Sequence, residues 1–259
     1  MPISIYPDAT QALPEELTLS HFLRTANNHE DKALKEFKEP LKILGGIDAL
    51  YMDITKEPGG ANPPVSGVLF LNAHASWRAA IRLALSGQIL PTFMTLRGSI
   101  ESALYANAMV VNPTLQNIWI ERDKSEKSRN ECRKKFTAKK MFKYLAEAHD
   151  QEFSKHIENI YNSTIDFGAH PNTRSILAST KIDEHKEHYT PNFTYIKAIG
   201  TFELSQALVA CAEIGISAFS ICLACFKSHP TIEHFYQRIT SAIDTVPLLI
   251  RAFDLKENS

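Results

Sequence analysis

The sequence predicts an all-α fold, a single-domain multi-helix bundle of about eight to ten helices that spans residues 1–259. Three observations support this prediction. Apolar residues recur at three- and four-residue intervals along most of the chain, as they do on the buried face of a helix. No segment of useful length alternates between apolar and polar residues as a half-buried strand does. Only 10 of the 259 residues are glycine, and so few glycines suit helices better than turn-rich sheets.

The N-terminal part of the chain is predicted to form two helices and a loop. The first helix covers about residues 14–27, because proline is favoured at the first helical position and two acidic residues follow Pro14. The second begins near His29 and is kinked or restarted at Pro40, since proline cannot donate a helical hydrogen bond. The sequence KEPGGANPP then predicts a flexible loop over residues 55–64.

Two long helices over residues 65–85 and 91–111 are predicted to form the centre of the bundle. They are separated only by a short connection around Ser86-Gly87-Gln88, and helices joined by so few residues pack antiparallel as neighbours. Further helices are predicted after Pro113, over 138–161 with a break near His149, after residue 172, over 201–227 and over 230–253 with a kink at Pro247. The polar segment 181–194 is predicted to be an irregular, flexible loop.

One predicted helix is apolar enough that a membrane-spanning segment has to be considered. Residues 207–226 contain a single charge, Glu213, and are long enough to span a bilayer. An isolated carboxylate at mid-membrane is costly, and the flanks lack a strong basic cluster. The segment is therefore interpreted as the central helix of the bundle, which is also apolar all round, and no membrane association is predicted.

The composition is that of an ordinary globular protein. The net charge is −1, so the whole molecule does not attract nucleic acid or an acidic membrane. The four cysteines do not form a disulfide framework, because three lie in one apolar segment where free cysteine packs as a small hydrophobe. The N-terminus lacks the pattern of a secretory signal, so we expect a cytoplasmic protein.

A polar line along the predicted helix 91–111 is the main candidate site. Arg97, Glu101 and Tyr105 recur at four-residue steps beside an apolar stripe. Burying such groups costs several kcal/mol unless each finds a partner, so other segments must supply partners. The line is either a network that pins helices together or one wall of a pocket for a small polar or anionic ligand. The antiparallel pairing is expected to bring His74 and Arg78 of the preceding helix near it.

A second candidate is His170-Pro171-Asn172, which follows a glycine turn. The conservative interpretation is a helix-entry motif in which His170 or Asn172 caps exposed amides. In the functional interpretation, His170 reaches the polar centre near Glu101, and the pair works as general acid and base.

The stretch from Arg122 to Lys143 contains ten Lys or Arg and three acidic residues. Arg129 and Arg133 share a face, but no aromatic residues interleave them as stacking platforms would require, so the sequence favours a solvated helix over nucleic-acid binding. Arg24 and His29 match the R-x4-H spacing of HEPN-type ribonucleases, a short pattern that arises easily by chance. No metal site is expected, because the histidines and acids at 184–188 and the pair Cys222-x2-Cys225 match no closed zinc pattern.

The middle of the chain, about residues 70–180, resembles a group of uncharacterised bacterial helical proteins. The motifs that carry the resemblance are Gly87-Gln88, Arg97-x3-Glu101-x2-Leu104-Tyr105, Asn112-Pro113, Trp119-x2-Arg122, Cys132-Arg133-x2-Phe136-Thr137 and Asp166-Phe167-Gly168-x-His170-Pro171-Asn172. The resemblance implies an all-helical fold and a bacterial, cytoplasmic origin, but it brings no function. It also implies that Arg97, Glu101, Trp119, Arg122, His170 and Asn172 belong to one constellation.

The sequence therefore predicts a helical binding or interaction protein whose polar network lines a small-ligand pocket. The candidate residues are His74, Arg78, Arg97, Glu101, Tyr105, Trp119, Arg122, His170 and Asn172. No cofactor is expected, and a homo-oligomer is left open. The alternative is an enzyme, either a HEPN-like ribonuclease that uses Arg24 and His29 or a hydrolase that uses His170 and Glu101.

Overall fold

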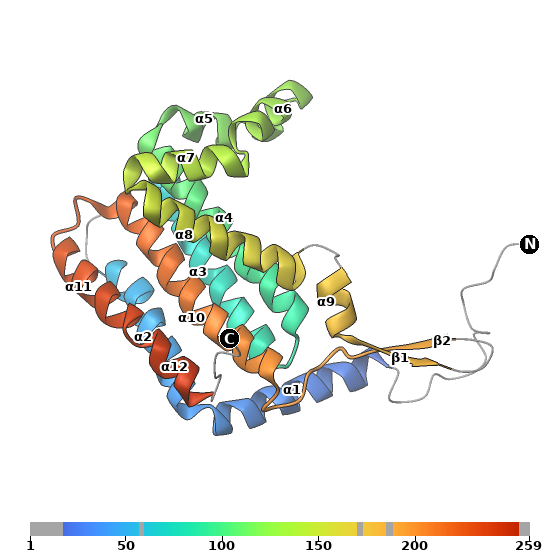
Figure 1. Cartoon of the computed structure of the whole chain (residues 1–259). Helices are drawn as coiled ribbons and strands as arrows, with labels where there is room; N and C mark the ends of the chain where they lie inside the picture. The colour runs from blue at the N-terminus through green and yellow to red at the C-terminus, as the bar shows by residue number, and fades with distance from the viewer. Residues whose placement is uncertain (1–17, 57–59, 170–172, 185–188, 254–259) are drawn as a thin grey trace, which may run out of the picture.

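The structure is a computed structural model that describes residues 18–56, 60–169, 173–184 and 189–253. Its centre is the pair of helices α3 (Pro64–Leu85) and α4 (Ile89–Val111) (Figure 1). Ser66 Oγ donates to the carbonyl of Ala106 at 3.0 Å, and Ser99 Oγ donates to the carbonyl of Ala73 at 2.9 Å. Residues early in α3 thus face residues late in α4, which confirms the predicted antiparallel pair.

The turn between α3 and α4 depends on Gly87. This residue has a φ of 80°, a conformation that side chains with a Cβ rarely adopt. A Cβ at Gly87 would also lie 2.6 Å from the carbonyl oxygen of Lys197. Glycine therefore allows both the tight turn and the close passage of the later chain, whose Lys197 N–H donates to the Gly87 carbonyl at 2.9 Å.

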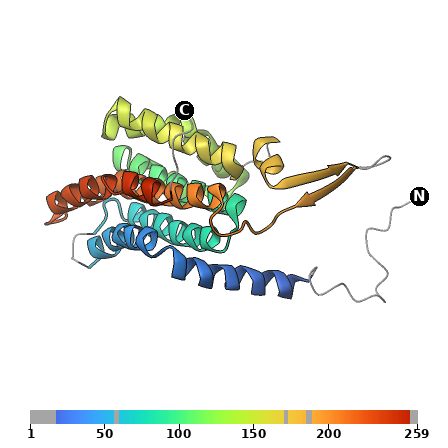
Figure 2. The ribbon, with the colours of Figure 1, turned by 60° about the horizontal axis from the view of Figure 1, so that its bottom comes forward.

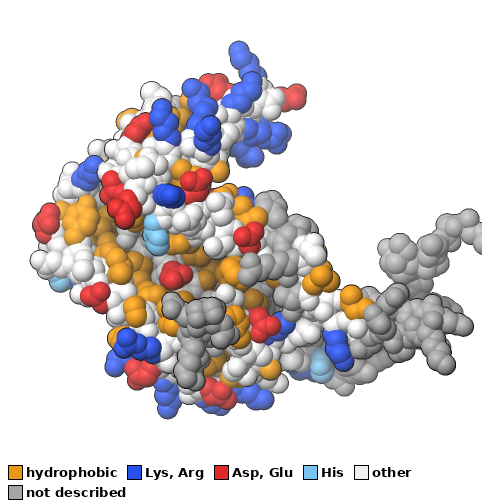
Figure 3. Space-filling view, in the orientation of Figure 1, with side chains coloured by type: hydrophobic (Ala, Val, Ile, Leu, Met, Phe, Trp, Pro, Cys, Tyr) orange, Lys and Arg blue, Asp and Glu red, His pale blue; other side chains and the backbone are white. Residues whose placement is uncertain are grey.

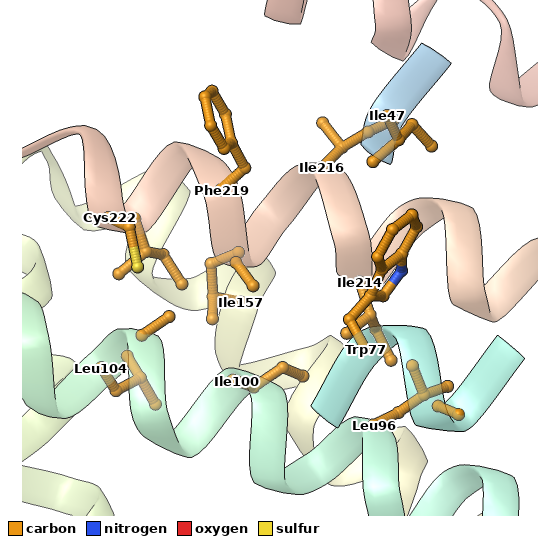
Figure 4. Packing of buried hydrophobic residues seen from close by; sticks show 14 of the residues in the cluster. Ile47, Trp77, Leu96, Ile100, Leu104, Ile157, Ile214, Ile216, Phe219 and Cys222 are labelled. Carbon is orange, nitrogen blue, oxygen red and sulfur yellow. The ribbon is translucent and has the colours of Figure 1, made fainter. Parts of the chain in front are cut away.

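The helix α10 (Phe202–Cys222) and the 3-10 turn η4 (Leu223–Phe226) pack against α2, α3 and α4. In Figure 4, Leu96, Ile100 and Leu104 of α4 lie under α10, and Phe219 and Ile216 point to its other side, where Ile216 lies beside Ile47. Phe202–Phe226 is long and apolar enough to cross a membrane, but 83% of its most apolar window is buried inside the fold. The prediction of a central bundle helix is confirmed.

The N-terminal helices differ from the prediction. Helix α1 (Leu19–Glu36) is capped by Thr18, whose Oγ1 accepts the His21 N–H at 3.1 Å, and it continues past His29. The chain breaks at Phe37, and α2 (Lys38–Ile54) follows. The predicted boundary at residues 27–29 is therefore wrong, whereas a restart at Pro40 is close to the observed one. Pro40 lies in the first turn of α2, where its missing N–H costs nothing.

The segment after α4 folds back over one end of the bundle. It comprises α5 (Thr114–Ile120), the 3-10 turn η2 (Arg122–Lys124), α6 (Glu126–Lys135), α7 (Ala138–Ala148) and α8 (Gln151–Thr164). Asp150 caps α8 by accepting the Phe153 N–H at 2.7 Å, so the predicted break near His149 is confirmed. Helices α7 and α8 contact α4, and α6 lies at the outer end of the molecule (Figure 1).

The segment predicted as an irregular loop, 181–194, is instead a β-hairpin. After η3 (Ile165–Ala169) and α9 (Thr173–Ala178), strands β1 (Thr180–Glu184) and β2 (Tyr189–Phe193) pair antiparallel, with Thr180 opposite Phe193. Both ribbon views show the hairpin extending from the helical body (Figures 1 and 2). None of the strand side chains that the structure describes is buried, Ile182 and Phe193 included, which is why the segment carries no alternating pattern.

The C-terminal part forms α11 (Ile232–Ile243) and α12 (Val246–Ala252), with the break just before Pro247 where a kink was predicted. In the described part of the chain, twelve α-helical segments accompany one two-stranded sheet, and α5, α9 and α12 have only six or seven residues. The all-α, multi-helix fold class is confirmed. All four cysteines are buried and free, and Cys211, Cys222 and Cys225 pack in the core as predicted.

Candidate functional site

The polar line of α4 receives its first partner from α8. Arg97 donates from Nε to Glu101 Oε1 at 2.9 Å and from Nη2 to the Tyr161 hydroxyl at 2.6 Å. The same hydroxyl donates to Glu101 Oε1 at 3.0 Å, which closes a triangle of hydrogen bonds. The Arg97 side chain is 21% exposed and that of Glu101 is 42% exposed, so the network is only partly buried.

The electrostatics of this triangle favour a neutral phenol. Burial raises the pKa of Tyr161 to about 12, and the charge of Glu101 acts in the same direction. Tyr161 therefore remains a hydrogen-bond donor to the carboxylate at neutral pH. Its ring also lies under the guanidinium of Arg97, with Cζ 4.8 Å from the ring centroid. The arrangement holds Arg97 and ties α8 to α4.

One turn further along α4, Tyr105 forms a wall of a pocket. Its ring packs on Phe136 with centroids 4.6 Å apart, and its hydroxyl lies 3.4 Å from the Phe136 carbonyl oxygen. The pocket has a volume of about 680 Å³ and falls in the range typical of small-molecule sites. Its lining residues are Tyr105, Trp119, Ile120, Arg122, Asp123, Cys132, Arg133 and Phe136. We refer to it as the α4–α5–α6 pocket.

Local capping interactions build the outer wall of this pocket. Asn112 Oδ1 accepts the Thr114 N–H at 3.2 Å at the start of α5. Ser125 Oγ accepts the Ser128 N–H at 3.0 Å and starts α6. The buried Cys132 and Phe136 then anchor the end of α6 near Tyr105. Short helices with caps at each turn thus fold the chain back toward α4.

The charge of the pocket is dominated by arginine. Asp123 accepts hydrogen bonds from Arg122 at 3.2 Å and from Arg129 at 3.2 Å. Arg133 makes no hydrogen bond or ion pair with any other residue that the structure describes. Arg122 and Arg129 therefore share one carboxylate, and the lining, with Arg122 and Arg133 against Asp123, carries a positive excess beside aromatic rings. Arginine binds carboxylates and phosphates through paired N–H groups, so this excess suits an anion.

The candidates His74 and Arg78 lie elsewhere, in a cluster with Asp48 of α2. Arg78 donates to Asp48 from Nε and Nη2, both at 2.7 Å, and His74 Nε2 lies 2.7 Å from Asp48 Oδ1. The expectation that they approach the polar line of α4 is wrong. The small residues Ser66 and Ala73 of α3 face α4. His74, the residue after Ala73, lies about 100° further around the helix and faces α2.

This second cluster ties helices together. The His74 ring stacks on Tyr51 of α2, with centroids 4.4 Å apart and planes 5° from parallel. Burial lowers the pKa of His74 and outweighs the opposing pull of Asp48, so the ring is neutral at pH 7. None of its charged members lines the α4–α5–α6 pocket. Sequence reasoning missed Asp48; its one signal is a carboxylate between the buried Ile47 and Leu50.

Of the remaining candidates, Trp119 and Arg122 line the pocket with Tyr105, whereas Arg97 and Glu101, which the resemblance places in one constellation with them, are not among its lining residues. Trp119 is half-buried, and the Arg122 side chain is 45% exposed. His170 and Asn172 lie outside the described residues. Sequence reasoning also missed Tyr161 and Asp123 as partners. A tyrosine on an amphipathic helix is usually interpreted as core, and an acid amid many basic residues is usually interpreted as solvated.

The two residues of the ribonuclease motif lie on different sides of α1. Arg24 and His29 lie within α1, not at a helix end as expected, and a five-residue separation places them about 140° apart around the helix. His29 Nδ1 lies 2.7 Å from the Leu85 carbonyl oxygen, whereas Arg24 is exposed. Among the described residues, no group of three or more His, Cys, Asp or Glu side chains is placed to hold a metal ion.

Comparisons of this chain with models of known protein families, with curated proteins and with solved structures find no match.

Proposed function

We propose that the protein is a binding module for a small anionic ligand with a flat or apolar body, held in the α4–α5–α6 pocket. The observation that carries this proposal is the combination of Arg133, which has no partner among the described residues, with the rings of Tyr105 and Trp119 around one cavity. An arginine facing a cavity can donate paired hydrogen bonds to a carboxylate or phosphate. The rings then hold an apolar or planar body by stacking.

We infer binding rather than general acid–base chemistry, because the carboxylate in the lining, Asp123, is engaged by Arg122 and Arg129. The described titratable groups in its lining include a phenol and a thiol whose pKa values are raised by burial, at Tyr105 and Cys132. Raised pKa values keep both groups protonated at neutral pH, so neither supplies a base. In this proposal the Arg97–Glu101–Tyr161 triangle positions the helix that carries Tyr105. The protein is proposed to be cytoplasmic.

The test is a fluorescence titration, because one of the two tryptophans reports on the pocket. Trp119 lines it, while Trp77 is 0% exposed in the core. We expect saturable quenching with benzoate or adenosine monophosphate, and weaker binding of inorganic phosphate, which offers no ring. Arg133→Gln should weaken binding by about tenfold, the loss of one charge-assisted hydrogen bond.

Lys134→Gln is the matched control. Lys134 is the neighbouring residue, it is exposed, and it does not line the pocket, so the same charge change there should leave small-ligand affinity unchanged. Equal weakening by both variants, or no saturable signal with any of the three probes, would overturn the proposal.

A further inference from the structure

The charge of this protein is separated along the chain. Residues 122–143 carry ten basic and three acidic side chains, a charge of +7. The whole chain carries −1, which leaves −8 on all other residues. In Figure 3, Lys and Arg side chains gather over the end of the molecule where Figure 1 places α5, α6 and α7. This end of the molecule is therefore basic although the protein as a whole is nearly neutral.

The basic helix α6 packs little against the rest of the protein. Of its ten residues only Cys132 is buried. The ammonium groups of Lys127, Lys134, Lys135 and Lys139 are exposed, and none forms an ion pair with an acidic residue in the described part of the chain. A helix that is polar all round contributes little to a core. Its unpaired cations suit a partner with repeated negative charge.

The fold brings aromatic rings from outside the basic stretch next to its arginines. Tyr105 comes from α4 and Trp119 from α5, and both line the pocket into which Arg122 and Arg133 project. Stacking rings beside phosphate-binding arginines are the two components with which proteins hold single-stranded nucleic acid. The linear spacing of the sequence conceals this combination, because the rings and the cations lie on different elements.

We propose that the anion bound in the α4–α5–α6 pocket is a nucleotide of a single-stranded nucleic acid, and that the lysines of α6 and the start of α7 bind the phosphates that follow it. This inference rests on the proposed function and names its ligand. A duplex fits less well, because its bases are stacked and cannot enter a pocket. A membrane surface also fits less well, because α6 has no apolar face to insert. RNA and DNA strands share the required chemistry.

The test uses the full chain and fluorescein-labelled oligouridine and oligothymidine of about 12 nucleotides, a length suited to one such site. We expect anisotropy titrations to show much tighter binding of an oligonucleotide than of uridine monophosphate. The triple variant K134Q/K135Q/K139Q should weaken oligonucleotide binding by more than about tenfold and leave monophosphate binding unchanged. Loss of three phosphate contacts should also reduce the slope of log affinity against log salt by about 2.

The matched control is K32Q/K35Q/K38Q, three exposed lysines of α1 and α2 with the same change in net charge. This control should retain oligonucleotide affinity. Trp119→Phe, which keeps a stacking ring, should bind both probes, and Trp119→Ala should weaken both. Comparing the affinities for oligouridine and oligothymidine shows whether RNA or DNA is bound more tightly.

Three results would overturn the inference: an oligonucleotide that binds no tighter than the monophosphate, equal weakening by the two triple variants, or binding to phosphatidylserine vesicles without binding to oligonucleotides. In each case saturable binding of the monophosphate would leave the proposed function standing. Absence of all small-anion binding would instead refute the proposed function itself.

Discussion

Gly215 of α10 lies against the indole of Trp77 of α3 so closely that a Cβ at Gly215 would be 2.5 Å from Trp77 Nε1. The indole N–H donates to the Cys211 carbonyl of α10 at 2.6 Å, and the Tyr51 hydroxyl of α2 donates to the Gly215 carbonyl at 2.7 Å. Three helices therefore meet at one glycine, and two buried ring side chains are hydrogen-bonded to the backbone of α10.

Gly215→Ala should destabilise the protein. The added methyl group cannot fit unless the fully buried indole moves, and overpacking of this kind costs about 1–3 kcal/mol. The free energy of unfolding, measured with urea, tests this. Gly45→Ala is the control: a Cβ at Gly45 in α2 meets nothing within 4 Å, so it should stabilise the helix by about 0.5–1 kcal/mol. Equal effects of the two variants would contradict this account.

The stability of the protein should rise with pH in a window set by His74. Burial lowers the pKa of His74 below its ordinary value of 6.5, so between these pKa values the unfolded chain binds a proton that the folded chain does not. The free energy of unfolding should therefore increase as the pH rises through that window and level off above it. Working above about pH 5 avoids the protonation of Asp48, whose pKa is lowered chiefly by its hydrogen bonds to Arg78.

His74→Gln should reduce this rise, because glutamine can donate to Asp48 but does not titrate. The rise is reduced and not abolished, since burial also lowers the pKa of His149. Urea unfolding at several pH values measures the slope. An unchanged slope in the variant would show that His74 does not carry the effect.

Glu101→Ala should lower the melting temperature. The substitution removes the acceptor of hydrogen bonds from Arg97 and Tyr161, and because Glu101 is partly exposed the expected loss is about 1 kcal/mol. It should also bring the pKa of Tyr161 below about 12, since the charge of Glu101 raises it. Thermal unfolding and a tyrosine titration measure the two effects.

Glu147→Ala provides the control for this experiment. Glu147 pairs with Lys143 at the same four-residue spacing in α7, but the two side chains are 3.8 Å apart and exposed. Its loss should change stability by less than about 0.5 kcal/mol. If the two glutamate variants melt alike, the Arg97–Glu101–Tyr161 triangle does not stabilise the fold.

Asn107→Leu should stabilise the protein or leave its stability unchanged. Asn107, near the C-terminal end of α4, is 0% exposed, and neither of its side-chain polar atoms has a hydrogen-bond partner among the residues that the structure describes. An unsatisfied buried amide costs about 1–3 kcal/mol, which a leucine of the same branched shape avoids. Ser99→Ala is the contrasting variant, because Ser99 is equally buried but donates to Ala73, so its loss should destabilise by about 1 kcal/mol. A clear loss of stability in Asn107→Leu would refute this prediction.

The long central helices were predictable because their signals are local. Periodic apolar residues, a glycine turn and a short connection lie within residues 65–111, and each constrains the next. The break between α7 and α8 is equally local, since Asp150 caps its own helix. The β-hairpin was not predicted because none of its described side chains is buried, so no covered face imposes an alternating pattern on them.

The partners of the polar residues could not be predicted in the same way. A polar residue such as His74 or Arg97 on a largely apolar helix indicates that a partner exists. Which helix supplies the partner depends on how the helices are rotated about their axes. A turn of about 100° per residue decides whether a side chain meets α2 or α4. For the same reason Tyr105, Trp119 and Arg122 could be named as candidates from the sequence. Their partners and those of the other polar residues, Asp48, Asp123 and Tyr161, could not.

The separation of +7 on residues 122–143 from −8 on the remainder gives the molecule a permanent electric dipole moment. The electric field of a polyanion orients such a molecule during its approach, so that the basic end with the pocket makes the first contact. The rate of productive collision should then fall with ionic strength even where affinity at the pocket itself is unaltered.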